Sequence, residues 1–89
     1  GEEFLMLLPD SDARGGGVVA ERIRVSLAAQ YLQTAAGPVK VSASFGVAEV
    51  KGPGCQGMGA SLVDAADRAL YAAKKAGRNR VVISYQGVP

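Results

Sequence analysis

The pattern of apolar and polar residues begins with an unbroken apolar run, Phe4-Leu-Met-Leu-Leu8, directly after two glutamates. Neither alternate set of positions in this run is polar, so it predicts a strand covered on both faces over about residues 3–8. Pro9 ends the strand because proline cannot donate to a β-ladder. The pattern therefore places Glu2 and Glu3 at the mouth of a rigid central strand.

A helical pattern follows over about residues 13–31. Its apolar residues recur at spacings of three and four, as one face of an amphipathic helix requires; they are Val19, Ala20, Ile23, Leu27 and Tyr31. Three consecutive glycines, residues 15–17, lie in the first turns, and each glycine costs ~1 kcal/mol relative to alanine in a helix interior. We therefore expect the first turn to fray and the firm helix to begin near Val18. A phosphate-binding role of the glycines is the alternative, although the GxxxxGK[ST] spacing is absent.

The next segment, residues 39–50, alternates between apolar and polar positions, which predicts an antiparallel strand with one covered face. Gly46 inside it indicates a bulge or a close approach of another backbone. Residues 51–60 contain a Gly-Pro-Gly turn, two further glycines and Cys55. We expect this segment to be a surface loop without a catalytic role.

The second helix carries clearer end signals. Ser61 is a candidate N-cap, Asp64 can complete a capping box, and Gly77 is a candidate C′ residue. Its apolar stripe consists mostly of alanine, which allows close packing on a sheet. A short strand over residues 80–85 completes the pattern. The expected order is β-α-β-α-β with a mostly antiparallel sheet, and the GxGxxG turn of a Rossmann unit is absent.

Composition limits the classes of protein that the chain can represent. Its 89 residues correspond to one small domain, and a hydrophobic content of 48% argues against disorder. No apolar run reaches the ~18 residues of a membrane span, and no leader of the secretory type is visible. Cys55 has no partner cysteine, which favours a cytoplasmic chain. Histidine is absent, so histidine acid–base chemistry is excluded.

Charged residues gather near both ends of the sequence, although the net charge of +2 is too small to indicate a nucleic-acid binder. Glu2 and Glu3 are adjacent carboxylates, and Mg²⁺ typically takes one or two carboxylates plus water and phosphate oxygens. A solvated acidic strand start is the alternative. Near the other end lies a basic cluster of Lys74, Lys75, Arg78 and Arg80. If folding brings the two ends together, one site would hold both metal-binding and phosphate-binding groups.

One face of the second helix is a further candidate. Asp67, Tyr71 and Lys74 follow spacings of four and three and would share this face, and Arg78 would extend the line just past the helix. The alternative is an ordinary solvated face on which Asp67 pairs locally.

Four segments resemble, in the same order, the motifs of the second half of a GGDEF domain, the catalytic module of diguanylate cyclases. Gly1-Glu2-Glu3-Phe4 resembles the end of the Gly-Gly-Asp/Glu-Glu-Phe hairpin. The others are AERIR at residues 20–24, VSASFGVA at 41–48, and ADRALY with AKKAGRNR across 66–80. Each segment alone is weak, but four in the family's order are specific, and together they cover essentially the whole chain.

The resemblance implies an α+β fold: the nucleotidyl-cyclase palm, which is ferredoxin-like, here as the C-terminal portion (residues 1–89) of a single domain lacking its N-terminal strands. It implies condensation of two GTP molecules into cyclic di-GMP with Mg²⁺ or Mn²⁺. One GTP would be held by each of two facing domains of a homodimer. Upstream sensor or regulatory domains are expected partners of the whole cytoplasmic or membrane-anchored protein, whereas nucleic acid and direct membrane contact are not.

The resemblance also implies roles for individual residues. Gly1 would belong to the substrate hairpin. Glu2 would be a metal ligand that helps to activate the attacking 3′-hydroxyl, and Glu3 would support metal and substrate positioning. Lys74 and Arg78 would bind the GTP phosphates, which fits a phosphoryl transfer that depends on positioning and charge neutralisation.

Other motif residues are expected to be structural, and some features of the family are missing from this sequence. Asp67 and Asn79 are expected to be structural, orienting the helix and its exit. The hairpin's first glycine and the upstream half, which in the family supplies another metal-binding aspartate and the guanine contacts, are absent. We therefore expect the chain alone to be inactive.

Two other functions stay open at the level of sequence. The first is a catalytically degenerate domain that serves as a nucleotide-binding or protein-interaction module. The second is a nucleic-acid scaffold that uses the basic cluster, although no aromatic stacking platform accompanies it. We also expect the apolar edge at residues 5–8 to drive strand pairing between chains, giving a dimer or aggregates.

Overall fold

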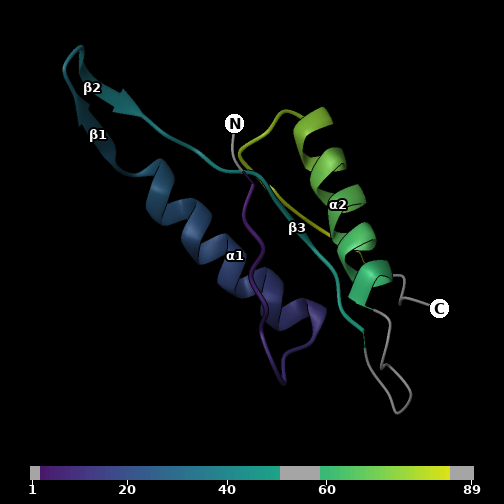
Figure 1. Cartoon of the computed structure of the whole chain (residues 1–89). Coiled ribbons are helices and arrows are strands. Elements are labelled where there is room, and N and C mark those ends of the chain that lie inside the picture. Colours follow the sequence, from purple (N-terminus) through teal and green to yellow (C-terminus); the bar gives the residue numbers. More distant parts are fainter. Residues whose placement is uncertain (1–2, 51–58, 85–89) are drawn as a thin grey trace.

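The computed structural model describes residues 3–50 and 59–84. The helices and strands in these ranges are labelled in Figure 1. In chain order they are α1 (Ala13–Ala28), β1 (Tyr31–Thr34), β2 (Gly37–Lys40), β3 (Phe45–Val47), α2 (Gly59–Lys75) and β4 (Val81–Ile83). The strands form two separate two-stranded sheets, β1–β2 and β3–β4. The predicted loop around Cys55 lies largely outside the described residues, and its last two residues begin α2.

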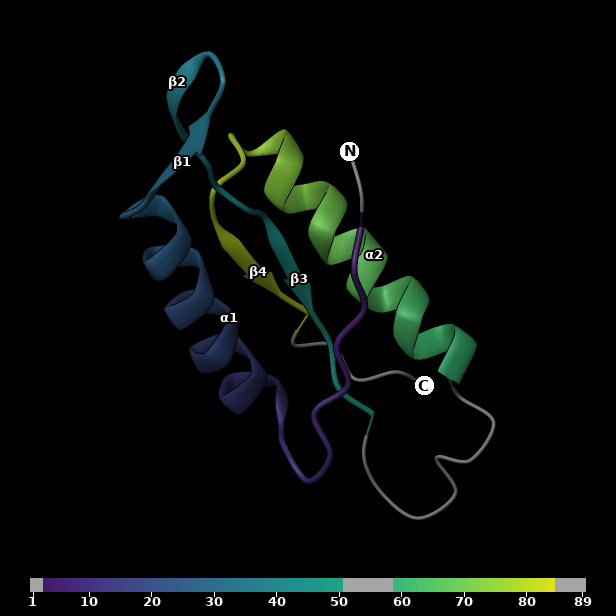
Figure 2. The same cartoon turned by 60° about the vertical axis from the view of Figure 1, so that its left-hand side comes forward.

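The packed part of the molecule is built on the pair β3–β4, with α1 on one side and α2 on the other (Figure 2). Both helices contact both strands. The strands are parallel, and Phe45 pairs with Val81 and Val47 with Ile83. The prediction of one antiparallel strand over residues 39–50 is therefore wrong. A strand that reaches its neighbour through a helix packed on the same sheet returns parallel to it.

Small residues allow α1 to lie close to the sheet. Its buried residues are Ala13, Gly16, Gly17 and Ala20, a spacing of three and four that forms one face. A Cβ at Gly16 would come within 3.0 Å of Val47, and one at Gly17 would overlap the side chain of Ile83. The expectation that the glycines fray the first turn is wrong, because the packing compensates their weak helix propensity. Asp12 caps the helix by accepting a hydrogen bond of 2.7 Å from the Gly15 amide.

Gly46 lets α2 approach β3, as its position inside a strand pattern indicated. A Cβ on Gly46 would overlap the backbone of Ala66 and Leu70, so the helix packs directly on the strand. The helix begins at Gly59, which makes the N-cap prediction for Ser61 wrong. Asp64 forms an ion pair with Arg68, an i, i+4 contact along the exposed face rather than part of a capping box.

The segment after α1 forms a hairpin that projects away from the packed part (Figure 1). The helix ends at Ala28 rather than near residue 31, because Tyr31 and the next three residues pair with β2, from Tyr31 opposite Lys40 to Thr34 opposite Gly37. The Thr34 hydroxyl donates to the Gly37 carbonyl at 2.7 Å and accepts from the Ala36 amide at 3.2 Å. Gly37 has φ 108°, which suits glycine.

Residues 3–8 do not form the predicted strand. Their side chains are exposed, with Phe4 at 90% and Leu7 at 71%, because no described strand pairs with them. The expected order β-α-β-α-β is thus wrong in its first element and in omitting the hairpin. The mixture of helices with short sheets, one antiparallel and one parallel, agrees with the predicted α+β class.

Candidate functional site

The two charged ends of the sequence meet at Glu3 and Lys74. The Lys74 Nζ donates to Glu3 Oε2 at 3.1 Å, across 71 positions of sequence. Lys74 lies in the last turn of α2, and its side chain is 35% exposed while that of Glu3 is 60% exposed. The condition stated for the sequence, that folding brings the two charged ends together, is met by this pair. An exposed ion pair of this kind contributes only about 0.2–1 kcal/mol to stability, so a ligand can displace it at little cost.

The other predicted site residues are placed less completely. Gly1 and Glu2 lie outside the described residues. Arg78 lies three residues past the end of α2 and is exposed. In the part of the chain that the structure describes, no hydrogen bond or ion pair of its side chain is found. The structure therefore brings the Glu3 carboxylate and the Lys74 ammonium together, and among the described residues no contact joins the Arg78 guanidinium to either of them.

The backbone beyond α2 makes an unusual turn over residues 77–80, which we call the exit turn. The Arg78 amide donates to the Ala73 carbonyl at 2.9 Å and the Gly77 amide to the Lys74 carbonyl at 3.4 Å. This is the Schellman arrangement, and Gly77, with φ 127°, is its C′ residue as predicted. Arg78 and Asn79 also have positive φ, at 63° and 47°. The chain thus keeps a left-handed conformation through three consecutive residues.

Asn79 ties the exit turn to two distant segments. Its amide donates to the Ser44 hydroxyl at 3.1 Å, and its side-chain Oδ1 accepts from Arg24 Nη1 at 3.2 Å. Arg24 in turn donates to both carboxylate oxygens of Glu21, at 2.7 and 2.8 Å. Hydrogen bonds from Arg24 hold the pKa of the Glu21 carboxyl below its ordinary value, and they raise the pKa of Arg24. These contacts agree with the expected structural role of Asn79.

Sequence reasoning gave Arg24 and Ser44 no individual role, although both lie in segments that resemble family motifs. Neither segment is close to Asn79 in sequence: 55 positions separate Arg24 from it and 35 separate Ser44. Their membership of these motif segments was the available signal, but only the fold shows which residue they contact.

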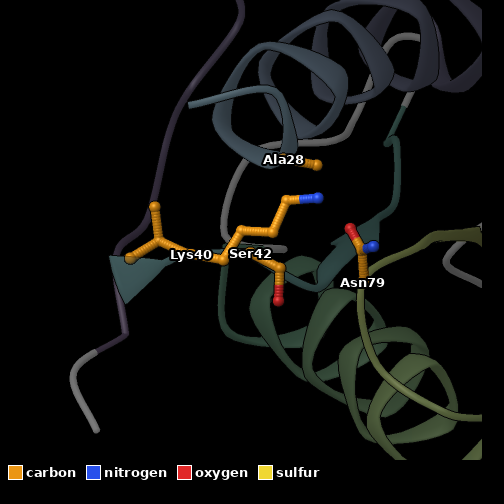
Figure 3. Close-up of a pocket in the computed structure, with 5 residues that line it drawn as sticks. Ala28, Lys40, Ser42 and Asn79 are labelled. Atoms are coloured by element: carbon orange, nitrogen blue, oxygen red, sulfur yellow. The ribbon is translucent and has the colours of Figure 1, made fainter. Parts of the chain in front are cut away.

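A hollow of about 240 Å³ lies beside Asn79, lined by Ala28, Lys40, Val41, Ser42 and Asn79. Figure 3 shows the Lys40 side chain extending between Ala28 and Asn79. The Lys40 ammonium also lies 5.8 Å from the centre of the Tyr31 ring. None of Glu3, Lys74 and Arg78 lines this hollow, so it is separate from the predicted site.

The face of α2 that carries Asp67 is a solvated one. Asp67 and Tyr71 are exposed, and the cation near the Tyr71 ring, at 5.6 Å, is Lys75 rather than Lys74. This observation favours a solvated face, except at Lys74, which pairs with Glu3. The expected local pairing of Asp67 is not found among the described residues.

The donor chemistry around Glu3 fits a magnesium ion only in part. Within residues 3–50 and 59–84, no group of three or more histidine, cysteine, aspartate or glutamate residues could hold a metal. Mg²⁺ needs as few as one or two protein carboxylates when substrate phosphates complete its shell. The exposed Glu3 carboxylate, with Glu2 next to it in sequence, suits such a site.

Over the described ranges, no helix is long and apolar enough to cross a membrane.

Comparisons with known proteins agree with the motif resemblance. The family model "Diguanylate cyclase, GGDEF domain" matches residues 1–80. The chain is 34% identical to diguanylate cyclase DgcP of Pseudomonas aeruginosa over 94% of its own length, and 36% identical to diguanylate cyclase A of Treponema denticola over its full length. It spans only 12% and 24% of those two relatives.

A solved structure supports the fold directly. The crystal structure of the GGDEF domain of DgcB from Caulobacter crescentus, in complex with c-di-GMP, matches with a TM-score of 0.76 and 33% identity. The match covers 89% of this chain and 45% of that one. The predicted partial palm fold is therefore confirmed.

Proposed function

The chain belongs to the family of diguanylate cyclase GGDEF domains, and we propose that it is the C-terminal portion of a domain that condenses two GTP molecules into cyclic di-GMP with Mg²⁺ or Mn²⁺. Two named diguanylate cyclases among its relatives support this reaction. The structural neighbour was solved in complex with c-di-GMP, which supports a nucleotide ligand. Because the chain spans less than half of that neighbour, the activity is proposed for the whole protein, and the 89 residues alone are inactive.

The single observation that carries the proposal is the contact between Glu3 and Lys74. A carboxylate suited to a metal lies 3.1 Å from an ammonium suited to a phosphate, and a metal–nucleotide complex needs both groups in one place. When the nucleotide binds, Lys74 exchanges the Glu3 carboxylate for a phosphate oxygen. Glu3 is then free to support the metal and position the substrate. The bound metal would neutralise phosphate charge and lower the barrier to attack.

The remaining residues have complementary roles. Glu2 would hold the metal and help to remove the proton of the attacking 3′-hydroxyl, and Gly1 would belong to the substrate hairpin. Arg78 binds the phosphates with its planar, always charged guanidinium. Each of two facing domains contributes one GTP, so the active form is a homodimer, regulated by further domains of a cytoplasmic or membrane-anchored protein.

The first test is cyclase activity of the full-length protein with GTP and Mg²⁺, with cyclic di-GMP detected by mass spectrometry. Glu2→Ala should lower the rate by at least about 100-fold, the usual scale for loss of a group that stabilises transition-state charge. Asp64→Ala is the control, since Asp64 is an exposed carboxylate whose one partner among the described residues is Arg68, and it should retain wild-type activity.

Each other result identifies a different function. GTP binding without product would indicate the degenerate regulatory module. RNA binding that weakens steeply with salt, without GTP binding, would indicate the nucleic-acid scaffold. Cyclic di-GMP made by the 89-residue chain alone would contradict its proposed inactivity.

A further inference from the structure

The backbone conformation of Arg78 needs an explanation that its own side chain does not supply. Arg78 has φ 63°, in the left-handed region, where the Cβ of an L-residue approaches the following carbonyl. Asparagine tolerates this region through local hydrogen bonds, but arginine has no such compensation. A residue stays in this conformation only where its surroundings hold it there, and such residues cluster at ligand-binding positions.

Hydrogen bonds on both sides of Arg78 hold the exit turn. Arg78 donates its amide to Ala73 and accepts a hydrogen bond of 3.0 Å on its carbonyl from Arg80 Nε, and both contacts are local. Contacts from outside the turn reach its last two residues. The Asn79 amide donates to the Ser44 hydroxyl, the Asn79 side chain accepts from the Arg24 guanidinium, and the Arg80 carbonyl accepts from the Phe45 amide at 2.9 Å. The exit turn is therefore fixed relative to α1, to the segment before β3 and to the start of β3, rather than to α2 alone.

Arg24 is itself arranged to hold Asn79 in place. Its Nε and Nη2 are both engaged by the Glu21 carboxylate, and its Nη1 is directed at Asn79. Its side chain is 21% exposed, against 52% for Glu21. A guanidinium whose charge is matched in this way is poorly suited to bind a phosphate but well suited to fix a neighbouring amide.

We propose that Arg24 and Ser44 are positioning residues that act through Asn79 to hold Arg78 where it binds the phosphates of the nucleotide. This rests on the proposed function, which assigns Arg78 to the triphosphate of GTP. The backbone of Arg78 is held on both sides while its side chain stays unengaged among the described residues. Preorganisation of this kind lowers the entropy that a flexible arginine loses on binding.

The experiment measures binding to the full-length protein without turnover. The probe is 3′-deoxy-GTP with Mg²⁺, which lacks the attacking hydroxyl, and the reference ligand is guanosine, which lacks the phosphates. Ser44→Ala and Arg24→Met should each weaken 3′-deoxy-GTP binding by roughly three- to tenfold, the scale of one lost hydrogen bond. Guanosine binding should not change. A merely structural role would weaken both ligands together.

Matched controls are available for both substitutions. Ser42→Ala removes a hydroxyl two residues away that makes no hydrogen bond among the described residues. Arg68→Met removes an arginine that pairs, within the described part of the chain, only with Asp64. Both should bind 3′-deoxy-GTP as the wild type does. Ser44→Thr keeps the hydroxyl and should restore most of the affinity that Ser44→Ala loses.

A second background decides whether the effect passes through Arg78. In an Arg78→Ala protein, Ser44→Ala should weaken 3′-deoxy-GTP binding no further. An equal loss with and without the Arg78 side chain would overturn the inference, as would unchanged binding by Ser44→Ala and Arg24→Met in the wild-type background. A wild-type protein that neither binds 3′-deoxy-GTP nor makes cyclic di-GMP would overturn the proposed function first, and the inference with it.

Discussion

Two apolar segments of this chain differ in whether they form a paired and covered strand. The longer one, residues 4–8, is wholly apolar, yet it forms no strand and leaves Phe4 90% exposed. The shorter one, β3, has a glycine at its centre, yet it is paired with β4 and covered by both helices. Hydrophobicity alone therefore does not make a strand in this molecule. A strand needs a neighbour that takes up its backbone hydrogen bonds.

The packed region uses small residues where the exposed segment uses large ones. Gly46 admits the backbone of α2, and Gly16 and Gly17 admit side chains of β3 and β4. The buried residues of α2 are Ala69 and Ala73. Close approach of backbones thus replaces large buried side chains as the source of cohesion, and this makes the packed region sensitive to the addition of single carbon atoms.

The largest expected effect comes from adding one methyl group at the centre of this packing. Gly46→Ala should cost about 3 kcal/mol, the upper part of the usual range for overpacking, because the new Cβ would overlap the backbone of Ala66 and Leu70. Backbone cannot move aside as a flexible side chain can. The measurement is hydrogen-exchange protection of the β3 and β4 amides in the full-length protein.

Gly59→Ala is the matched control. Gly59 is the first residue of α2, and a Cβ there would meet none of the described residues within 4 Å. Its effect on the same protection should stay within about 0.5 kcal/mol. If Gly46→Ala were equally mild, close packing of α2 on β3 would not be the source of stability.

This contrast also explains which parts of the fold the sequence could predict. Local signals succeeded where a residue type has one physical use: Gly77 ends α2 with positive φ, and Gly46 marks a close backbone approach. The prediction from glycines 15–17, a frayed first helical turn, was wrong because helix propensity includes the free-energy cost of glycine but not the close packing that glycine permits. The strand predicted over residues 3–8 was wrong for a similar reason, because a strand depends on neighbouring strands that the apolar pattern of the segment itself does not reveal.

The candidate site likewise contains some residues that the sequence could predict and others that only the fold identifies. The motif resemblance pointed to Glu3 and Lys74, and folding does bring them to 3.1 Å. Arg24 and Ser44 could not be assigned from sequence, since their importance depends on hydrogen bonds to Asn79 across 55 and 35 positions. Pairings of polar side chains over such separations are set by tertiary structure.

A smaller effect is expected from a charge in the exposed segment. We expect the 89-residue chain alone to form dimers or larger aggregates through residues 5–8, because an unpaired apolar edge favours strand addition. Leu7→Lys should shift it toward the monomer in light scattering. Because Leu7 is 71% exposed, the protection of β3 should change by less than about 0.5 kcal/mol.

The same substitution should have different effects in the 89-residue chain and in the full-length protein. In the full-length protein, where other strands of the domain can cover this segment, Leu7→Lys should destabilise by about 2 kcal/mol, as burial of a polar group does. Val18→Lys is the control, since Val18 is an apolar residue of α1 that is 48% exposed, and it should change neither measurement. A wild-type 89-residue chain that stays monomeric at high concentration would contradict the expected association.

The smallest effect concerns pH and the support of the exit turn. The pKa of Glu21 is lowered from 4.5, chiefly by its hydrogen bonds from Arg24. A carboxyl whose pKa is lower in the folded state stabilises the protein above its unfolded pKa, and this stabilisation is lost as the pH falls through the folded value. In an NMR titration of the side chain, the pKa of Glu21 should lie below 4.5, and Arg24→Met should return it toward that value, whereas Arg68→Met should not.

Because Glu21 is exposed, the effect of its protonation on global stability should be slight. Protonation nevertheless weakens the hydrogen bonds between the Glu21 carboxyl group and Arg24, which orient the Arg24 side chain. The Asn79 amide should therefore become less protected from hydrogen exchange over the same pH interval, after correction for intrinsic exchange. A Glu21 that titrates at or above 4.5 would show that the pair does not hold Arg24 in solution.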